Sequence, residues 1–404
     1  MTPRKRGRMN RSPEPDPNRR VRATSIGADE EPIAPKVMHG EDLTSGEYAK
    51  DYKPAFEGLD EAPVVDLQYP SRSKPERFAL VVPLKSDGYK PIEDITETVE
   101  AICTHYFPTT RDALLHESSG YPSRLKRAFR QQNLEDFRTT LSEFNGLVHS
   151  AVTSGAIAQH LDNNLSSLPL PLIERILSQT YARTVSPRVE TVKRYTSGSD
   201  NVYGELLPRF VHEIFRETSL TSSHVFVDLG SGVGNVVLQA ALERGCEAWG
   251  IEMMPNPSKL ASLQASEIRE RAQLWNISLG ALHLIEDDFL SNPAIDAVLR
   301  RADVIVVNNK VFSPDLNDAL LDKFLDLKEG TRVVSLQAFS DPDRVITERN
   351  VNDRQNLFVC QRREYWSGFV SWTDVGGEWF VQRKDAGGLR RFREGRRRRG
   401  ERDD

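Results

Sequence analysis

The sequence predicts an α/β protein with a Rossmann-like sheet of parallel strands, preceded by a mostly helical region and flanked by basic tails. A short strand at 225–228 runs directly into three glycines and then into an apolar helical stretch. From residue 225 to residue 336, strand and helix patterns alternate, as parallel strands joined by helical crossovers require. Before residue 200, apolar residues recur instead at helical spacing.

Both ends of the chain are basic, whereas its body is acidic. Residues 1–25 hold eight Lys or Arg and two acids, and residues 390–404 hold eight Arg and four acids, so the remainder carries about −15 although the whole chain carries −5. Residues 1–50 lack apolar periodicity, and we expect them to form a disordered tail, with a second basic tail at 386–404. Such tails bind polyanions by releasing counterions and can act as nuclear import signals; solvated disorder without a partner is the alternative.

The composition bounds the class of protein. At 404 residues the chain can hold two or three domains. It has no apolar run of membrane-spanning length and no signal-peptide core, so we expect a soluble intracellular protein without membrane contact. Cys103, Cys246 and Cys360 lie far apart without a C-x-x-C pair, which indicates neither a disulfide framework nor a metal site.

An N-terminal helical subdomain is expected over 75–200. A strand-like stretch at 78–84 leads into helical patterns at 92–106, 134–152 and 170–183. In the second of these, Leu134, Phe137, Leu141, Phe144 and Val148 fall on one helical face.

The ligand-binding core is expected over 201–385. After the glycines, its predicted elements are a strand at 247–252, a helix at 258–274, strands at 282–288 and 303–309, a helix at 316–325, a strand at 332–336, and a hairpin at 365–380 around a Gly376-Gly377 turn. Because ligands bind parallel sheets outside the carboxyl ends of the strands, the residues at those ends are the candidate site.

The stretch VFVDLGSGVGN, residues 225–235, indicates a nucleotide-like ligand. Three bare glycines let a ligand approach the main chain and the helix N-terminus closely. Dinucleotide loops read G-x-G-x-x-G, but here the third glycine comes one residue early, Asn235 takes its place, and Asp228 ends the strand. A carboxylate at that point suits a cationic ligand better than a diphosphate, which disfavours a nicotinamide-dependent oxidoreductase.

Acids at the next two strand ends extend this site. Glu252 lies 24 residues after Asp228, close to the spacing at which such an acid accepts hydrogen bonds from ribose hydroxyls. Asp288 and Phe289 can bond an adenine amine and cover its face. Any one alone is more often a solvated acid at a strand end, so the succession of three carries the prediction.

The stretch 202–210, VYGELLPRF, allows two interpretations. Composition alone favours an ordinary helix start, whereas Gly204 beside Glu205 could fold over the ligand as a lid.

The pattern D-x-G-x-G-x-G resembles the first motif of the S-adenosylmethionine-dependent methyltransferases. Over residues 75–385 the chain resembles the disruptor-of-telomeric-silencing family, non-SET methyltransferases that act on lysine 79 of histone 3 in nucleosomes. The motifs that carry the resemblance are VYGEL at 202–206, FVDLGSGVGNVVLQAA at 226–241, GIE at 250–252, DDFL at 287–290, VNN at 307–309, LKEGTRVVSL at 327–336 and VSWT at 370–373.

The resemblance implies a class I methyltransferase fold, S-adenosylmethionine as cofactor, a nuclear location, and roles in silencing, transcription control and the DNA damage checkpoint. It places Tyr203 and Glu205 on a loop over the cofactor, with Glu205 near the methionyl end. The remaining roles that it implies are the methionine moiety for Asp228, Gly230, Gly232 and Asn235, the ribose for Glu252, the adenine for Asp288 and Phe289, the lysine entrance for Asn308, and the walls of a narrow channel for Phe312 and Trp379.

The resemblance also implies partners: the nucleosome, its DNA through the basic tails, and ubiquitin on the nucleosome as a further candidate. Two positions depart from the family pattern. Lys310 stands where an aromatic residue is expected, and Trp379-Phe380 stands where a tyrosine pair is usual. Two rival functions follow: a methyltransferase of RNA or a small molecule, and a non-catalytic chromatin-binding module.

Overall fold

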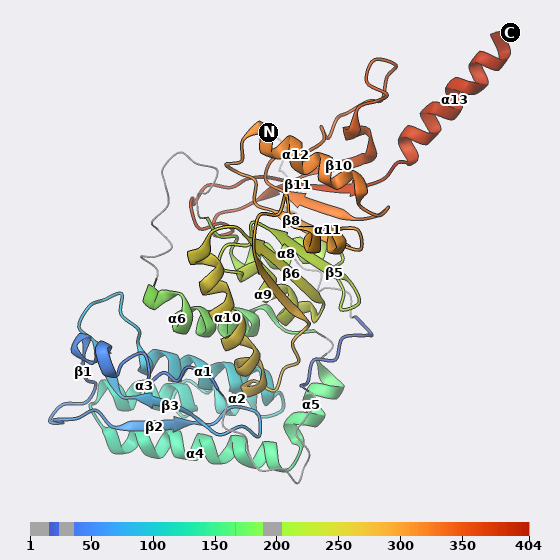
Figure 1. The fold of residues 1–404 in the computed structure, drawn as a ribbon. Coiled ribbons are helices and arrows are strands. Elements are labelled where there is room, and N and C mark those ends of the chain that lie inside the picture. The colour runs from blue at the N-terminus through green and yellow to red at the C-terminus, as the bar shows by residue number, and fades with distance from the viewer. Residues whose placement is uncertain (1–15, 24–35, 166, 189–203, 404) are drawn as a thin grey trace, which may run out of the picture.

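The computed structural model describes residues 16–23, 36–165, 167–188 and 204–403. Figure 1 shows three parts in succession: a region of helices and short strands, a central sheet with helices on both faces, and a C-terminal end from which one long helix projects. The expected α/β, Rossmann-like fold is confirmed.

The central sheet has seven strands in the order β10-β11-β9-β8-β5-β6-β7. Their bounds are β5 Val225–Leu229, β6 Glu247–Glu252, β7 Leu282–Glu286, β8 Val304–Val307, β9 Arg332–Ser335, β10 Phe358–Tyr365 and β11 Gly377–Lys384. The pairs β6-β7, β5-β6, β5-β8 and β8-β9 are parallel, whereas β11 runs antiparallel to both β9 and β10. The chain continues from β5 to β6 on one side and later to β8 on the other, so the carboxyl end of β5 is a topological switch point, where ligands bind such sheets.

Alternate residues of the strands bury opposite faces of the sheet. Phe226 joins a core with helices α8 (Pro208–Glu217), α9 (Asn235–Gln239) and α10 (Pro255–Leu274). Val225 and Val227 join a second core with α11 (Pro293–Leu299) and α12 (Pro314–Lys323). Both faces are thus apolar, as expected of a sheet covered by helices on each side.

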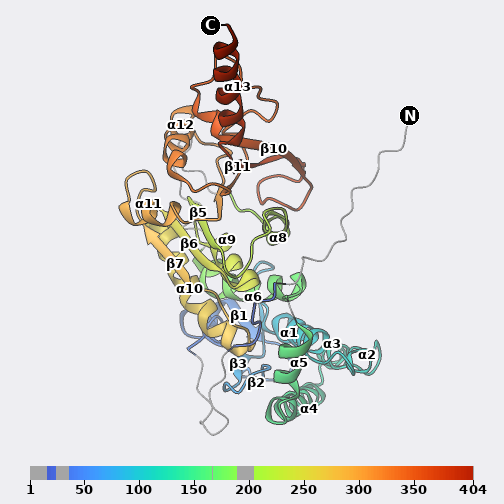
Figure 2. The same ribbon diagram turned by 90° about the vertical axis from the view of Figure 1, so that its right-hand side faces the viewer.

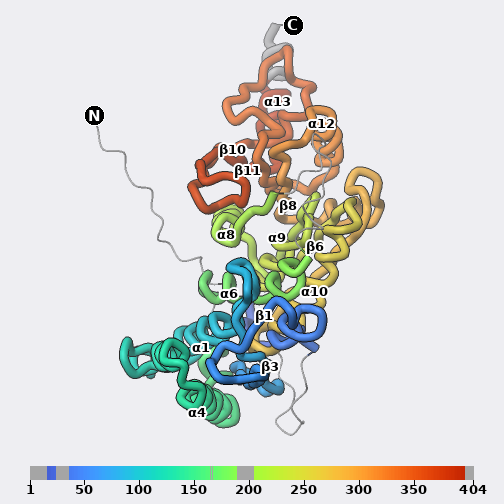
Figure 3. Tube along the Cα trace, turned by 90° about the vertical axis from the view of Figure 1, so that its left-hand side faces the viewer, coloured from blue at the N-terminus to red at the C-terminus, as the bar shows by residue number. Residues whose placement is uncertain are grey.

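The N-terminal region combines helices with two small sheets, β1-β4 and β2-β3. Its elements are η1 Gly46–Asp51, β1 Tyr52–Pro54, β2 Val64–Leu67, β3 Glu76–Ala79, β4 Val81–Pro83, α1 Pro91–Tyr106, α2 Arg111–Leu114, α3 Tyr121–Arg130, α4 Leu134–Thr153, α5 Ala156–Asn164, α6 Leu170–Thr184 and η2 Ser186–Arg188. Helices α1, α4 and α6 lie where the apolar spacing predicted them. Figure 3 shows α6 between this region and the sheet, and α6 packs on α10.

The remaining short helices are η3 Ala240–Arg244, a turn of π-helix that continues α9, η4 Phe324–Asp326 after α12, and η5 Arg354–Leu357 before β10. None of the helices within the described ranges is long and apolar enough to cross a membrane. Within the same ranges, no group of three or more His, Cys, Asp or Glu side chains could hold a metal ion. The three cysteines are free thiols.

Parts of the segment expected to be disordered pack against the body instead. Arg19 donates hydrogen bonds to the carbonyl oxygens of Leu242 and Ser278, both at 2.8 Å, and Val21 is 2% exposed. Val37 and Leu43 are buried as well. A few apolar side chains are enough to hold this segment in place, because it packs on a surface formed by the rest of the chain. The composition of the segment alone does not show that such a surface exists.

The C-terminal part differs from the expectation in two places. The hairpin is formed by β10 and β11, so most of 365–380 is the loop between them rather than its strands. Residues 387–403 form a helix, α13 (Gly387–Asp403), which projects from the body in Figure 2. The carboxylate of Asp385 accepts the N–H of Gly387, the first residue of this helix, at 2.8 Å.

Candidate functional site

The glycine loop follows β5 at the switch point. Gly230, Gly232 and Gly234 have φ values of +80°, +55° and +88°, a region that residues with a Cβ rarely adopt. The N–H groups of Gly230 and Ser231 donate to the carbonyl of Ile251, which ties the loop to the end of β6. The backbone is therefore left bare where α9 begins, as the sequence predicted.

Two acids flank this loop at adjacent strand ends. Glu252 accepts the N–H groups of Gly232 at 2.9 Å and of Met254 at 2.8 Å. Asp228 is 4% exposed, and burial, with a smaller contribution from Glu252, raises its pKa to about 7. Burial also raises the pKa of Glu252. Within the described residues neither acid forms a salt bridge, so the pair is suited to a cationic ligand or to hydroxyl donors.

The third strand end supplies an acid and an aromatic ring. The N–H of Asp287 donates to the carbonyl of Glu252, so β7 ends beside β6. Asp288 accepts the N–H of Leu290 at 2.8 Å, which holds the turn. Phe289 is buried and stacks on Phe312, with 6.3 Å between ring centroids. The sheet thus brings the three predicted acids to one edge.

The segment after the undescribed residues closes one side of this edge. Tyr203 lies outside the described residues. The N–H of Glu205 donates to the Ser371 hydroxyl at 2.9 Å, and the N–H of Ser371 donates to the Glu205 carbonyl at 3.0 Å. The N–H of Leu207 donates to the carbonyl of Phe369 at 2.9 Å. Residues 204–207 therefore form an extended strip against the β10-β11 loop, and α8 begins directly after it.

The side chain of Glu205 faces the glycine loop. Asn235, the first residue of α9, donates from Nδ2 to Glu205 Oε1 at 3.0 Å. Gln264 of α10 donates from Nε2 to Asn235 Oδ1 at 2.9 Å and to the carbonyl of Val233 at 2.6 Å. Next to these residues, α6 lines a hollow of about 290 Å³.

The two asparagines after β8 have different surroundings. Asn309 is fully buried and accepts the N–H groups of Leu336 and Gln337 at 2.9 and 2.8 Å, so it holds the connection after β9. Asn308 donates from Nδ2 to the carbonyl of Gly204 at 3.0 Å. Its Oδ1 is buried without a hydrogen-bond partner in the described structure. A buried acceptor left open in this way fits a donor from a bound molecule.

The predicted channel residues do not all meet. Phe312 lies against the glycine loop, where a Cβ on Gly230 would be 3.8 Å from its ring. Trp379 is 1% exposed, packs edge-on against Phe210 at 5.4 Å, and donates from Nε1 to the Glu364 carbonyl at 3.3 Å. It is a core residue under the β10-β11 loop.

Trp372 is the aromatic residue that the structure brings to this edge instead. A Cβ on Gly204 would lie 2.7 Å from its indole ring, and Trp372 is 36% exposed. The SWT motif in the sequence could have indicated Trp372 and Ser371 as site residues. No motif indicated Gln264. Lys310 is exposed, and its carbonyl accepts a bond from Gln337.

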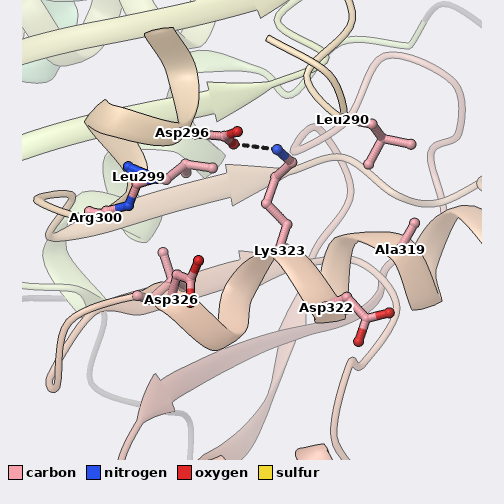
Figure 4. Close-up of a pocket in the computed structure, with 9 residues that line it drawn as sticks. Leu290, Asp296, Leu299, Arg300, Ala319, Asp322, Lys323 and Asp326 are labelled. Carbon is pink, nitrogen blue, oxygen red and sulfur yellow. Dashed lines mark hydrogen bonds and ion pairs between the residues drawn. The ribbon is translucent and has the colours of Figure 1, made fainter. Parts of the chain in front are cut away.

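A second hollow, of about 390 Å³, lies between α11 and α12 (Figure 4). Lys323 and Asp296 form an ion pair across it. None of the predicted site residues lines this hollow.

Comparison with known proteins identifies the family. The model of "Histone methylation protein DOT1" matches residues 181–383. The "Histone-lysine N-methyltransferase, H3 lysine-79 specific" of Emericella nidulans is 46% identical over 96% of this chain and 78% of its own length, and that of Aspergillus fumigatus is 48% identical over the same shares.

Solved structures were compared as well. An RNA methyltransferase from Salinibacter ruber in complex with S-adenosyl-L-homocysteine is 20% identical, with a TM-score of 0.30 over 45% of this chain and 92% of that chain. A putative class I S-adenosylmethionine-dependent methyltransferase from Listeria monocytogenes is 10% identical, with a TM-score of 0.37 over 72% of this chain and 88% of that chain. By its sequence, the chain belongs to the DOT1 family of histone methylation proteins.

Proposed function

We propose that this chain is a histone-lysine N-methyltransferase that transfers methyl groups from S-adenosylmethionine to lysine 79 of histone 3 in nucleosomes. The observation that carries the proposal is the similarity, over nearly the whole chain, to relatives named for this activity. The site supports it, because its acids at three strand ends and its bare glycine loop suit a ligand that carries positive charge, ribose hydroxyls and an adenine ring.

The residues present fit S-adenosylmethionine. Asp228, which is buried, and Glu252, which is half-buried, form no salt bridge within the described structure, and Asn308 keeps an open acceptor. In this assignment Glu252 would hold the ribose, Asp288 and Phe289 would hold the adenine, and Gly230 and Gly232 would leave room for the methionyl part. Asp228, Asn235 and Glu205 would hold its charged end, and Tyr203 belongs to the same assignment.

The lysine approaches from the side of Asn308. Asn308, through the carbonyl of Gly204, is linked to the strip that Trp372 covers. We assign the aromatic wall of the lysine entrance to Phe312 and Trp372, and not to the core residue Trp379.

The bound cofactor supplies a methyl group on a positively charged sulfur. The chain must present a neutral lysine amine, and lowering the pKa of an amine from about 10.4 to neutrality costs about 4.6 kcal/mol at 1.36 per unit. Aromatic walls disfavour the charged amine by desolvation, and a cation nearby disfavours it by repulsion. No dedicated base is then needed, and alignment of nitrogen with the methyl group is the main contribution of the protein.

The decisive experiment is to incubate the protein with labelled S-adenosylmethionine and, separately, intact nucleosomes, free histones and RNA. Label confined to histone 3 of the intact particle supports the proposal. Label on RNA would favour the first rival function.

A Gly232→Arg variant separates the enzyme from a non-catalytic module. Arginine at a position with φ +55° strains the glycine loop, and its side chain fills the space that the bare backbone leaves for the cofactor. Methyl transfer should therefore be lost. Nucleosome binding that persists in this variant, with no transfer by the wild type, would support the module.

The proposal extends to finer partners and location. The basic tails would contact nucleosomal DNA, ubiquitin on the nucleosome would be a further contact, and the protein would act in the nucleus in chromatin silencing.

A further inference from the structure

We propose that Gln264 is a positioning residue for the cofactor site: it fixes which end of the Asn235 side-chain amide faces Glu205. The inference rests on the proposed function, which places Asn235 and Glu205 at the charged end of S-adenosylmethionine. The inference adds to the cofactor site a residue of α10 that belongs to none of the sequence motifs.

An asparagine side chain has nearly the same shape in either orientation but opposite hydrogen-bonding ends. Its surroundings must therefore decide whether the oxygen or the NH₂ group points toward a given neighbour. At Asn235 one neighbour is a carboxylate, which only accepts. The wrong orientation would set the Asn235 oxygen against the Glu205 carboxylate, so that two acceptors face each other.

Gln264 determines the orientation of the Asn235 amide because the orientation of the Gln264 amide is itself fixed by a main-chain carbonyl. Its Nε2 lies 2.6 Å from the carbonyl oxygen of Val233, which can only accept, so the group there must be the donor. The second hydrogen of the same NH₂ group then reaches Asn235 Oδ1 at 2.9 Å. Asn235 is left to donate from Nδ2 to Glu205 Oε1 at 3.0 Å.

The chain of bonds has fixed polarity at both ends, a backbone carbonyl at Val233 and a carboxylate at Glu205. Gln264 is 1% exposed, so it makes these bonds away from bulk water. The main chain of Glu205 is held separately by Ser371. Gln264 therefore acts on the direction of the Glu205 side chain and not on the position of its backbone.

The test measures S-adenosylmethionine binding by calorimetry with the full chain, and thermal unfolding in parallel. Gln264→Met keeps the volume and removes both donors, whereas Gln264→Glu replaces the donor by an acceptor. We expect Gln264→Glu to weaken binding about tenfold, the value of one hydrogen bond to a charged group, and Gln264→Met to weaken it less. A matched control is Gln68→Met, which removes a buried carboxamide that also donates to main-chain carbonyls but lies in the N-terminal region; its binding should equal the wild type.

A second background separates positioning from a merely structural effect. In a Glu205→Gln variant, position 205 can donate, so Asn235 can turn over and satisfy a glutamate at 264. The penalty of Gln264→Glu should then fall from about tenfold to about twofold relative to Glu205→Gln alone. General loosening of α10 would give the same penalty in both backgrounds.

The outcomes are distinct. Equal binding by folded wild type, Gln264→Met and Gln264→Glu would overturn the inference, as would equal penalties in the two backgrounds. A folded wild type that binds no S-adenosylmethionine would instead overturn the proposed function, and the inference with it.

Discussion

At Asp228, stability and binding make opposite demands on the charge of one carboxyl group. Its carboxyl is buried at the end of the central strand, and burial, with a smaller contribution from Glu252, raises its pKa to about 7. In the unfolded chain the pKa is about 3.9. Between these values the folded protein holds a proton that the unfolded chain has released, so folding is favoured by low pH.

The contribution of Asp228 to the free energy of unfolding should therefore fall as pH rises. The stabilisation from Asp228 is fully present below about pH 4 and is lost as pH rises through 7. For Asp228→Asn, which stays neutral, we expect the ligand-free protein to gain about 3 kcal/mol of unfolding free energy over the wild type between pH 5 and pH 8. Urea unfolding of both proteins at the two pH values measures this, and parallel pH profiles would contradict it. S-Adenosylmethionine binding should meanwhile weaken, since the cation loses its ionised partner.

The residues that the sequence could identify are those whose position in the chain fixes their place in the sheet. Asp228, Glu252 and Asp288 end successive strands, so their meeting follows from the parallel topology. Gln264 and Trp372 could not be identified in this way, because their role depends on which distant segment packs against them. Trp379 shows the same limit, since an aromatic residue in a strand fills either a core or a channel.

At the scale of elements, the strip 204–207 and the β10-β11 loop act as one unit. Ser371 holds Glu205 by two bonds, one from its hydroxyl and one from its main chain. We expect Ser371→Ala to remove the first, worth about 0.5–1.5 kcal/mol, and to weaken S-adenosylmethionine binding about two- to twelvefold.

Calorimetry of Ser371→Ala beside Thr373→Ala checks this prediction. Thr373 also uses its hydroxyl to accept a main-chain N–H, that of Val375, but within the loop. The control should bind like the wild type. Equal loss in both variants would mean that the loop as a whole, and not the bond to Glu205, matters.

The contact between the strip and the β10-β11 loop explains why the sequence predicts the hairpin at 365–380 instead of at 358–384. Residues 365–380 are dense in aromatic residues and strand formers, which are typical of a hairpin. The strands are 358–365 and 377–384, because only there does β11 find β9 as a partner. The aromatic stretch between them is used to cover Gly204 and the start of α8, a tertiary demand that local propensity does not contain.

For the whole molecule, a buried ionic junction joins the N-terminal region to the sheet. Glu76 of β3 accepts from Arg183 of α6 at 2.6 Å and from Arg271 of α10 at 3.0 Å, and all three side chains are fully buried. Burial alone would raise the pKa of Glu76, but the two arginines outweigh it and hold the pKa below its ordinary value.

Glu76→Gln should therefore destabilise the protein strongly, by about 3–5 kcal/mol, because two buried guanidinium groups lose their shared charge partner. Denaturant unfolding measures the loss. Glu143→Gln breaks an exposed pair with Arg124 and should cost at most about 1 kcal/mol. Similar small losses in both variants would show that the junction relaxes when its charge is removed.

Charge is separated along the whole chain, with basic ends and an acidic body. In the proposed function, an acidic body would repel DNA and the basic ends would attract it; helix α13, whose sequence includes the arginines at 396–399, projects from the body (Figure 2). Each phosphate that a tail neutralises releases about 0.9 counterion. Replacing the four arginines at 396–399 by alanine should make the slope of log K against log salt less steep by up to about 4.

Deletion of residues 1–15 should act in the same direction, whereas deletion to residue 25 would also remove Arg19 and Val21 from the packed surface and unfold part of the protein. Nucleosome binding between about 50 and 200 mM salt measures the slopes. Calorimetry with S-adenosylmethionine serves as the control and should be unchanged, because the arginines at 396–399 and residues 1–15 take no part in the proposed cofactor site. A slope equal to that of the wild type in both variants would place the DNA contact on the body and refute a role for the tails.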